Sequence, residues 1–139
     1  MAETMTGACL CGAVQYQLNK PVKAVANCHC NTCKKISGAA FQTVVIVDRD
    51  AFEITAGKEI LSSYQMTENA RKHFCRNCGS AVYVLHKKFP ASCLLQLGSL
   101  SDPTAVQPTI NVFCETMLPW VKDITALPSF DQRPEKGNA

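Results

Sequence analysis

Seven of the nine cysteines lie in three short clusters, and this clustering constrains the fold more than any other feature of the sequence. The clusters are Cys9-Leu10-Cys11, Cys28-His29-Cys30-Asn31-Thr32-Cys33 and Cys75-Arg76-Asn77-Cys78. Thiols at CxC and CxxC spacing are typical of zinc sites, in which a tight turn presents two sulfur atoms to one metal ion. The sequence therefore predicts a chain that is folded around bound metal.

Two of the clusters together supply a complete zinc site. A structural zinc ion takes four protein ligands in a tetrahedron. The CxC and CxxC pairs provide four sulfur ligands, from Cys9, Cys11, Cys75 and Cys78. Such a site would join the start of the chain to its middle, and the free energy of metal binding would then stabilise the fold.

The remaining cluster supplies only three sulfur ligands, from Cys28, Cys30 and Cys33. A zinc ion with three protein ligands keeps its fourth position for water or a substrate atom, which is the arrangement of catalytic sites. Such an ion can ionise a bound water or bind a thiol as its thiolate. The competing interpretation is an inert site with a fourth protein ligand. The candidates for that ligand are His29, Cys93 and Cys114.

The composition argues against a nucleic-acid or membrane partner. The formal charge is +3 with neutral thiols. Ionising seven thiols around two zinc ions removes this excess, and the basic residues form no stripe with interleaved aromatic residues. Apolar runs such as 44–47 are far too short to span a bilayer. We expect a cytoplasmic protein, because the N-terminus has no signal-peptide pattern and clustered cysteines in a reducing compartment bind metal more often than they form disulfides.

Short apolar or alternating segments separated by turn signals predict a mainly β fold of twisted antiparallel sheets with one or two helical turns. The expected strands are 13–18, 22–28, 40–47, 52–55, 59–65, 70–74, 81–86, 93–97 and 110–115. We expect a hairpin between 52–55 and 59–65, and a helical turn that Asn31 or Thr32 caps and Gly38 ends. Residues 1–128 are expected to form a single domain, and the polar tail 129–139 is expected to fray.

Several motifs occur together along most of the chain. They are Cys-Leu-Cys-Gly-Ala-Val at 9–14, Cys-His-Cys-Asn-Thr-Cys at 28–33, Phe-Cys-Arg-Asn-Cys-Gly at 74–79, Leu-Gly-Ser-Leu-Ser-Asp-Pro at 97–103 and Leu-Pro-Trp at 118–120. In this order they resemble the glutathione-dependent formaldehyde-activating enzyme family, also called the centromere protein V/formaldehyde-activating family. The resemblance implies an Mss4-like fold with zinc knuckles and two zinc ions (Zn2+) per chain.

The resemblance also implies roles for the cysteines. The structural zinc would be held by Cys9, Cys11, Cys75 and Cys78. The open, catalytic zinc would be held by Cys28, Cys30 and Cys33. The implied activity is that of a carbon–sulfur lyase acting on S-hydroxymethylglutathione, the adduct of glutathione and formaldehyde. The expected partners are therefore a small thiol such as glutathione and a small aldehyde, and edge strands make a homodimer a further expectation.

This chain departs from the usual family pattern at two places. Asn111 stands where a histidine is common before the Leu-Pro-Trp segment, and Lys34-Lys35 stands where an arginine is usual. No catalytic residue is assigned beyond the zinc ligands. His73 is either a general base or a strand residue at the surface, and Trp120 either walls a pocket or closes the core. Cys93 and Cys114 are expected in the apolar core.

Two other functions stay open. One is a non-catalytic, zinc-stapled binding module for a protein partner, because a fold does not fix a function. The other is a thiol-redox role for the CxCxxC cluster, with reversible disulfide formation and release of zinc.

Overall fold

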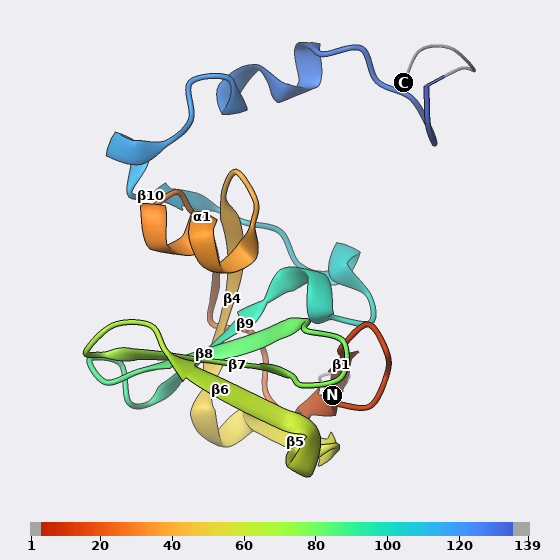
Figure 1. Ribbon diagram of the computed structural model, residues 1–139, viewed down its shortest axis with the longest axis vertical. Coiled ribbons are helices and arrows are strands. Elements are labelled where there is room, and N and C mark those ends of the chain that lie inside the picture. The colour runs from red at the N-terminus through yellow and green to blue at the C-terminus, as the bar shows by residue number, and fades with distance from the viewer. Residues whose placement is uncertain (1–3, 135–139) are drawn as a thin grey trace.

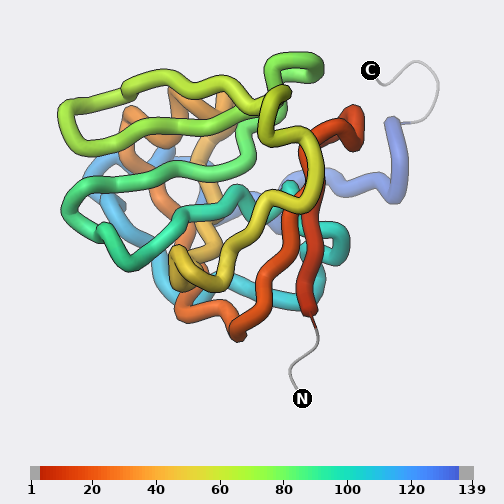
Figure 2. The backbone as a smooth tube through the Cα atoms, turned by 90° about the horizontal axis from the view of Figure 1, so that it is seen from below, coloured from red at the N-terminus to blue at the C-terminus, as the bar shows by residue number. Residues whose placement is uncertain are grey.

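The computed structural model describes residues 4–134, which form two β-sheets (Figure 1). The small sheet is antiparallel, and its strands are β1 (Met5–Ala8), β2 (Gln15–Leu18) and β5 (Phe52–Ala56), in that order. Figure 2 shows the first two strands in red beside the yellow third strand. The order of the large sheet is β10-β3-β4-β9-β8-β7-β6. Its strands are β3 (Ala24–Cys28), β4 (Gln42–Asp48), β6 (Leu61–Gln65), β7 (Ala70–Cys75), β8 (Ala81–His86), β9 (Ser92–Gln96) and β10 (Ile110–Val112).

The prediction of a mainly β fold with short helical turns is confirmed. Within the described residues the α-helical part is α1 (Asn31–Ser37), which Gly38 ends in the left-handed conformation as expected. The 3₁₀ turns are Arg49–Ala51, Lys58–Ile60, Leu97–Ser99, Pro103–Ala105, Cys114–Thr116 and Val121–Ala126. None of these helices has the length and the apolar sequence that crossing a membrane requires.

The predicted hairpin between 52–55 and 59–65 is wrong. Strand β5 pairs with β2 in the small sheet, whereas β6 pairs with β7 in the large sheet. The chain changes sheets at Gly57, which has a φ of 82° and is followed by the 3₁₀ turn Lys58–Ile60. A Cβ atom at Gly57 would lie 2.2 Å from the carbonyl oxygen of Ala13, so the crossing depends on glycine.

The core lies between the inner faces of the two sheets. Val14, Tyr16 and Leu18, which the alternation of the sequence placed on one face, are buried there. The Tyr16 ring packs on Phe52 with centroids 5.2 Å apart, and Phe52 packs on Tyr83 at 4.8 Å, so aromatic contacts join the sheets. Fully burying an apolar side chain such as that of Leu18 is worth about 1.5–3 kcal/mol.

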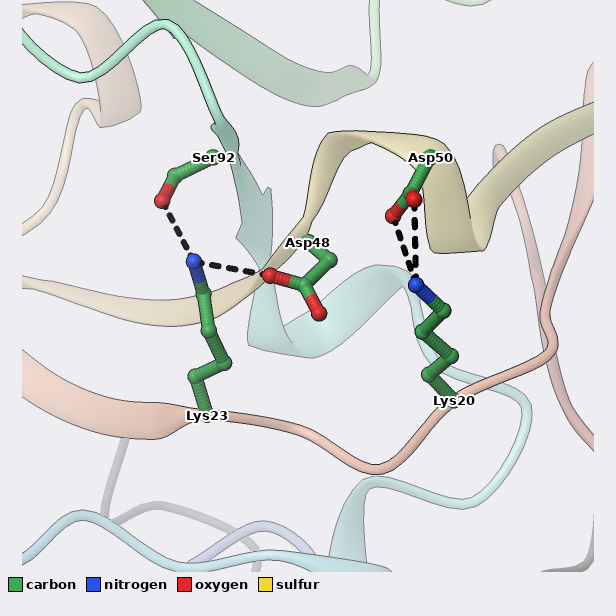
Figure 3. Close-up of polar contacts among 5 residues, drawn as sticks. All are labelled: Lys20, Lys23, Asp48, Asp50 and Ser92. Carbon is green, nitrogen blue, oxygen red and sulfur yellow. Dashed lines mark hydrogen bonds and ion pairs between the residues drawn. The ribbon is translucent and has the colours of Figure 1, made fainter.

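Two surface ion pairs hold the turn after β2 against the end of β4 (Figure 3). Lys20 Nζ lies 3.0 Å from Asp50, and Lys23 Nζ lies 3.0 Å from Asp48 while it also donates to the Ser92 hydroxyl at 2.8 Å. The hydrogen bond to Asp50 raises the pKa of Lys20. Exposed pairs of this kind contribute at most about 1 kcal/mol each, so they orient the turn more than they stabilise the fold.

The chain after β10 leaves the two sheets. Strand β10 pairs in parallel with β3 and ends at Val112, because Phe113 adopts a left-handed conformation with a φ of 57°. Figure 1 shows the following segment in blue, running past α1 and away from the sheets. Its exposed large apolar residues are Phe113, Trp120, Ile124, Leu127 and Phe130. Residues 129–134 of the predicted tail are exposed, and residues 135–139 lie outside the described part of the chain.

Candidate metal centres

The structure brings the CxC and CxxC pairs together into one four-cysteine cluster. Cys9 and Cys11 lie in the turn between β1 and β2, and Cys75 and Cys78 lie at the turn between β7 and β8. The Sγ atoms of Cys9 and Cys11 are 3.6 Å apart, those of Cys11 and Cys75 are 3.7 Å apart, and all four lie within 4.8 Å of one another. A tetrahedron with Zn–S bonds of about 2.3 Å has S–S edges of about 3.8 Å, so this donor set fits zinc.

Each of the two turns closes on a glycine that follows its second cysteine. Gly12 has a φ of 81° and donates its N–H to the Cys9 carbonyl at 3.1 Å. Gly79 has a φ of 77° and donates to the Cys75 carbonyl at 2.8 Å. A left-handed residue at this point lets the chain turn back while both sulfur atoms stay on the same side. Both turns therefore end on a left-handed glycine, although one hydrogen bond spans three residues and the other spans four.

Ser80 favours the ionised form of one of these cysteines. Its Oγ accepts the Leu10 N–H at 3.1 Å, which leaves its own proton for the Sγ of Cys78 at 3.2 Å. This hydrogen bond, together with the backbone N–H of Ser80, lowers the pKa of Cys78 to about 5. For Cys9, burial opposes ionisation, but hydrogen bonds from the Val14 backbone and from a neighbouring thiol outweigh it and lower the pKa.

The other three cysteines form a second cluster at the start of α1. Cys28 ends β3, and the Sγ of Cys30 accepts the N–H of Cys33 at 3.3 Å and caps the helix. The cap is therefore a metal-ligand candidate, and the prediction of Asn31 or Thr32 as the cap is wrong. The sulfur atoms of Cys28 and Cys30 are 3.5 Å apart, and those of Cys28 and Cys33 are 3.0 Å apart.

The hydrogen bonds within this cluster favour ionisation of one sulfur atom, that of Cys30, over the other two. The Cys33 thiol donates to Cys28, and the Cys28 thiol donates to Cys30. Burial raises the pKa of Cys28 and of Cys33, whereas at Cys30 the hydrogen bonds from Cys33 and Cys28 outweigh burial and lower the pKa. Three converging soft donors suit a zinc ion, whose charge would hold all three as thiolates.

None of the residues proposed as a fourth ligand joins the three-cysteine cluster in the described part of the chain. His29 directs Nε2 to the side chain of Asn111 at 3.0 Å. Cys93 is buried in the core as predicted, and burial raises its pKa to about 12. Cys114 is exposed, so its predicted place in the core is wrong: β10 ends at Val112, and Cys114 lies in the turn beyond it.

His73 is not among the side chains that gather at the three-cysteine cluster. Its ring stacks on Tyr83 with centroids 4.3 Å apart, and burial, followed by the charge of Arg71, lowers its pKa. Side chains alternate along a strand, so His73 points away from the face of β7 that carries Lys72. Trp120 is exposed and contributes neither to the core nor to the groove described next.

A groove of about 670 Å³ lies beside the four-cysteine cluster and reaches α1. Cys9 lines it, and so do Ile36 and Ser37 of α1, where the Ser37 hydroxyl donates to the Cys33 carbonyl at 2.7 Å. Its remaining lining residues are Ala8, Leu10, Lys72, Gly79, Ser80, Ala81, Gln96, Gly98, Ser99, Leu100 and Ser101. Lys72 is the one charged residue of this set, so the groove offers a cation and several hydroxyl groups.

Residues 4–116 match the family model described as glutathione-dependent formaldehyde-activating enzyme. This match covers most of the chain, so the chain belongs to the glutathione-dependent formaldehyde-activating enzyme family. The family that the motifs indicated is thereby confirmed.

Three curated proteins are similar to the chain. A putative glutathione-dependent formaldehyde-activating enzyme of Halomonas elongata is 29% identical over 92 residues, which cover 62% of this chain and 59% of that protein. A protein of the same name from Penicillium rubens is 34% identical over 71 residues, covering 51% and 37% respectively. An uncharacterized lyase of Schizosaccharomyces pombe is 26% identical over 77 residues, covering 55% and 54%. The chain thus spans between 37% and 59% of the length of these relatives.

A solved structure shares the fold. The crystal structure of a Rhodobacter sphaeroides protein superimposes with a TM-score of 0.63 and 22% sequence identity, covering 78% of this chain and all of that chain.

Proposed function

We propose that this protein is a zinc-dependent enzyme of the carbon–sulfur lyase type that acts on a thiol–aldehyde adduct similar to S-hydroxymethylglutathione. The observation that carries the proposal is the three-cysteine cluster, which gathers three sulfur ligands and no fourth within the described residues. Family membership and the names of the relatives support the choice of glutathione as the thiol and formaldehyde as the aldehyde.

The two clusters would hold two zinc ions with different roles. The structural ion would be bound by Cys9, Cys11, Cys75 and Cys78, and it would fasten the small sheet to the large one. The second ion would be bound by Cys28, Cys30 and Cys33. A zinc ion with an open position supplies Lewis acidity and stabilises a thiolate or a hydroxide there.

The reaction breaks one bond and moves one proton. In the lyase direction the C–S bond of the adduct breaks, its electron pair goes to sulfur, and the hydroxyl group loses its proton as the carbonyl group forms. The products are a free thiol and the aldehyde, and the reverse direction joins them again. No oxidant or reductant is consumed, which fits a cluster of metal-bound thiolates better than a redox-active disulfide.

The groove fits the rest of a glutathione-like substrate. Lys34 does not line the groove, and its Nζ donates to the carbonyl oxygen of Thr116 at 2.6 Å. Lys72 is therefore the cation that the groove offers to a carboxylate. None of the described residues that line the groove is acidic, so no carboxylate among them would repel an anion. Ile36 and Ser37 lie about one helical turn from Cys33, so a ligand in the groove would have to extend along this turn of α1 to reach the three-cysteine cluster.

The second candidate is a non-catalytic binding module with a protein partner. The five exposed large apolar residues of the segment 113–130 favour it, because exposed apolar side chains gathered in one segment are available to a partner. The same residues would serve a homodimer. In this alternative the second zinc would be inert, and the thiols would have no role in turnover. A reducing compartment such as the cytoplasm suits either function, because both need free thiols.

The test compares zinc-loaded wild-type protein with Cys30→Ser. We expect two zinc ions per chain in the wild type and one in the variant. NMR exchange spectroscopy of glutathione, formaldehyde and their adduct should show faster interconversion with the wild type alone. Equal rates with and without the wild-type protein would refute the enzyme and favour the binding module, whereas equal acceleration by both proteins would exclude the three-cysteine cluster as the site.

A further inference from the structure

The residue between two of the candidate zinc ligands is fixed by the C-terminal segment. The His29 side chain is fully buried, its ring packs against Phe41 with centroids 5.0 Å apart, and its Nε2 lies 3.0 Å from Oδ1 of Asn111 on β10. A residue between two ligands in a CxC turn usually points away from the metal. Here that residue, His29, makes a hydrogen bond with Asn111.

Asn111 belongs to a row of polar side chains that crosses three strands. Its Oδ1 also accepts a hydrogen bond from Nδ2 of Asn27 at 3.2 Å, and Oδ1 of Asn27 accepts one from the Thr43 hydroxyl at 2.7 Å. The three residues are direct register partners: Asn111 lies opposite Asn27, and Asn27 lies opposite Thr43. The pairing of β10 with β3 and of β3 with β4 brings these side chains together, and the hydrogen bond from Asn27 directs Oδ1 of Asn111 toward its acceptor role.

These contacts assign the proton of His29. Oδ1 of Asn111 can only accept, so Nε2 of His29 must carry a hydrogen. In the neutral ring Nδ1 is then an acceptor, and it is buried without a hydrogen-bond partner in the described residues. Losing the Asn111 acceptor would leave two unpaired nitrogen atoms on a buried ring. The His29 ring would then have no hydrogen bond from the described residues that fixes its orientation.

The main chain of His29 is held by the same segment. Its N–H donates to the Val112 carbonyl at 3.1 Å, and its carbonyl accepts the Thr116 hydroxyl at 2.9 Å. Both main-chain groups and the side chain of His29 thus bind residues 111–116. Since Cys28 and Cys30 are its chain neighbours, the position of their sulfur atoms depends on this attachment.

We propose that Asn111 is a positioning residue for the three-cysteine cluster: acting through His29, it holds the Cys28–Cys30 turn in the orientation in which the three sulfur atoms converge on one metal ion. The proposal rests on the metal binding proposed for this cluster but not on turnover of any adduct. Outer partners of this kind typically change metal affinity by about 10–100-fold when they are removed.

The test uses three variants of the full chain. Asn111→Leu removes the acceptor at nearly constant size, Asn111→Asp keeps an acceptor, and Ile110→Ala is the matched control because Ile110 is an exposed neighbour on β10. Cobalt is loaded in place of zinc, and the Cys30→Ser spectrum identifies the bands of the four-cysteine cluster. Long-range 1H–15N NMR of the zinc-loaded protein reports which His29 nitrogen carries the proton.

We expect Asn111→Leu to change the cobalt bands of the three-cysteine cluster, to weaken that site about 10–100-fold in chelator competition, and to lose the pure Nε2–H tautomer. Asn111→Asp and Ile110→Ala should keep all three properties. Unchanged bands, affinity and tautomer in Asn111→Leu would overturn the proposal, and so would equal weakening of both metal sites. A wild-type chain that binds cobalt here without accelerating the exchange reaction would refute only the proposed function.

Discussion

Replacing Gly57 by alanine should destabilise the protein more than the same replacement at Gly38. Both glycines are left-handed, with φ of 82° and 67°, and an alanine there costs about 1–2 kcal/mol through its backbone conformation. A Cβ atom at Gly38 meets nothing within 4 Å, so that cost is the whole effect. At Gly57 the Cβ atom would lie 2.2 Å from the Ala13 carbonyl oxygen and 2.9 Å from the Val14 Cα.

The overlap at Gly57 is with backbone atoms, which cannot rotate away. Relieving it requires a shift of the chain that enters β2, and overpacking of this kind costs about 1–3 kcal/mol. The expected loss is therefore about 2–5 kcal/mol for Gly57→Ala and about 1–2 kcal/mol for Gly38→Ala. Urea unfolding of the zinc-loaded proteins, at one fixed concentration of free zinc, measures both values. Equal losses would refute the argument that the crossing between the two sheets leaves no room for a side chain.

Three further predictions concern the groove and the two cysteines outside the clusters. Lys72→Met should raise KM for the glutathione adduct with little change in kcat, because in the proposed function Lys72 binds a carboxylate of the substrate and not the reacting atoms; a fall in kcat at constant KM would contradict this. Cys114 should react first with iodoacetamide and Cys93 only after unfolding, which mass spectrometry of the zinc-loaded protein reports; early labelling of Cys93 would contradict its burial. Cys93 ionises near its ordinary pKa of 9.0 when unfolded and at about 12 when folded, so its contribution to stability is present below pH 9 and falls as the pH rises toward 12. Between pH 8 and 11 the free energy of unfolding should therefore fall less steeply with pH in Cys93→Ala than in the wild type. The same slope in both proteins would contradict the raised pKa of Cys93.

The cysteine spacing predicted which sulfur atoms lie together. The grouping of Cys9 and Cys11 with Cys75 and Cys78 needed only the rule that a closed zinc site takes four ligands, and the structure gathers these four. The strand positions followed from alternation and turn residues, and most observed strands lie inside the predicted ranges or within a residue of them. Local chemistry was sufficient for both features.

Features that depend on contacts between distant segments were not accessible in this way. Strand β1 was missed because Met5–Ala8 is short and has no apolar alternation, and it forms by pairing with β2. The pairing of β5 with β2 rather than with β6 is decided by space around Gly57, which only the fold reveals. Cys114 was wrongly predicted in the core because its position depends on where β10 ends. Asn111 was given no role because its contacts depend on the register of β10 with β3.

The most direct test of the central claim is cadmium-113 NMR of the cadmium-loaded protein during titration with glutathione. Cadmium reports the number of sulfur ligands at each site. Two signals are expected. The signal of the four-cysteine cluster stays constant, whereas the signal of the three-cysteine cluster shifts as the glutathione thiolate takes the fourth position and is absent in Cys30→Ser. Two signals that both ignore glutathione would contradict an open site that accepts a thiol, and with it the proposed chemistry.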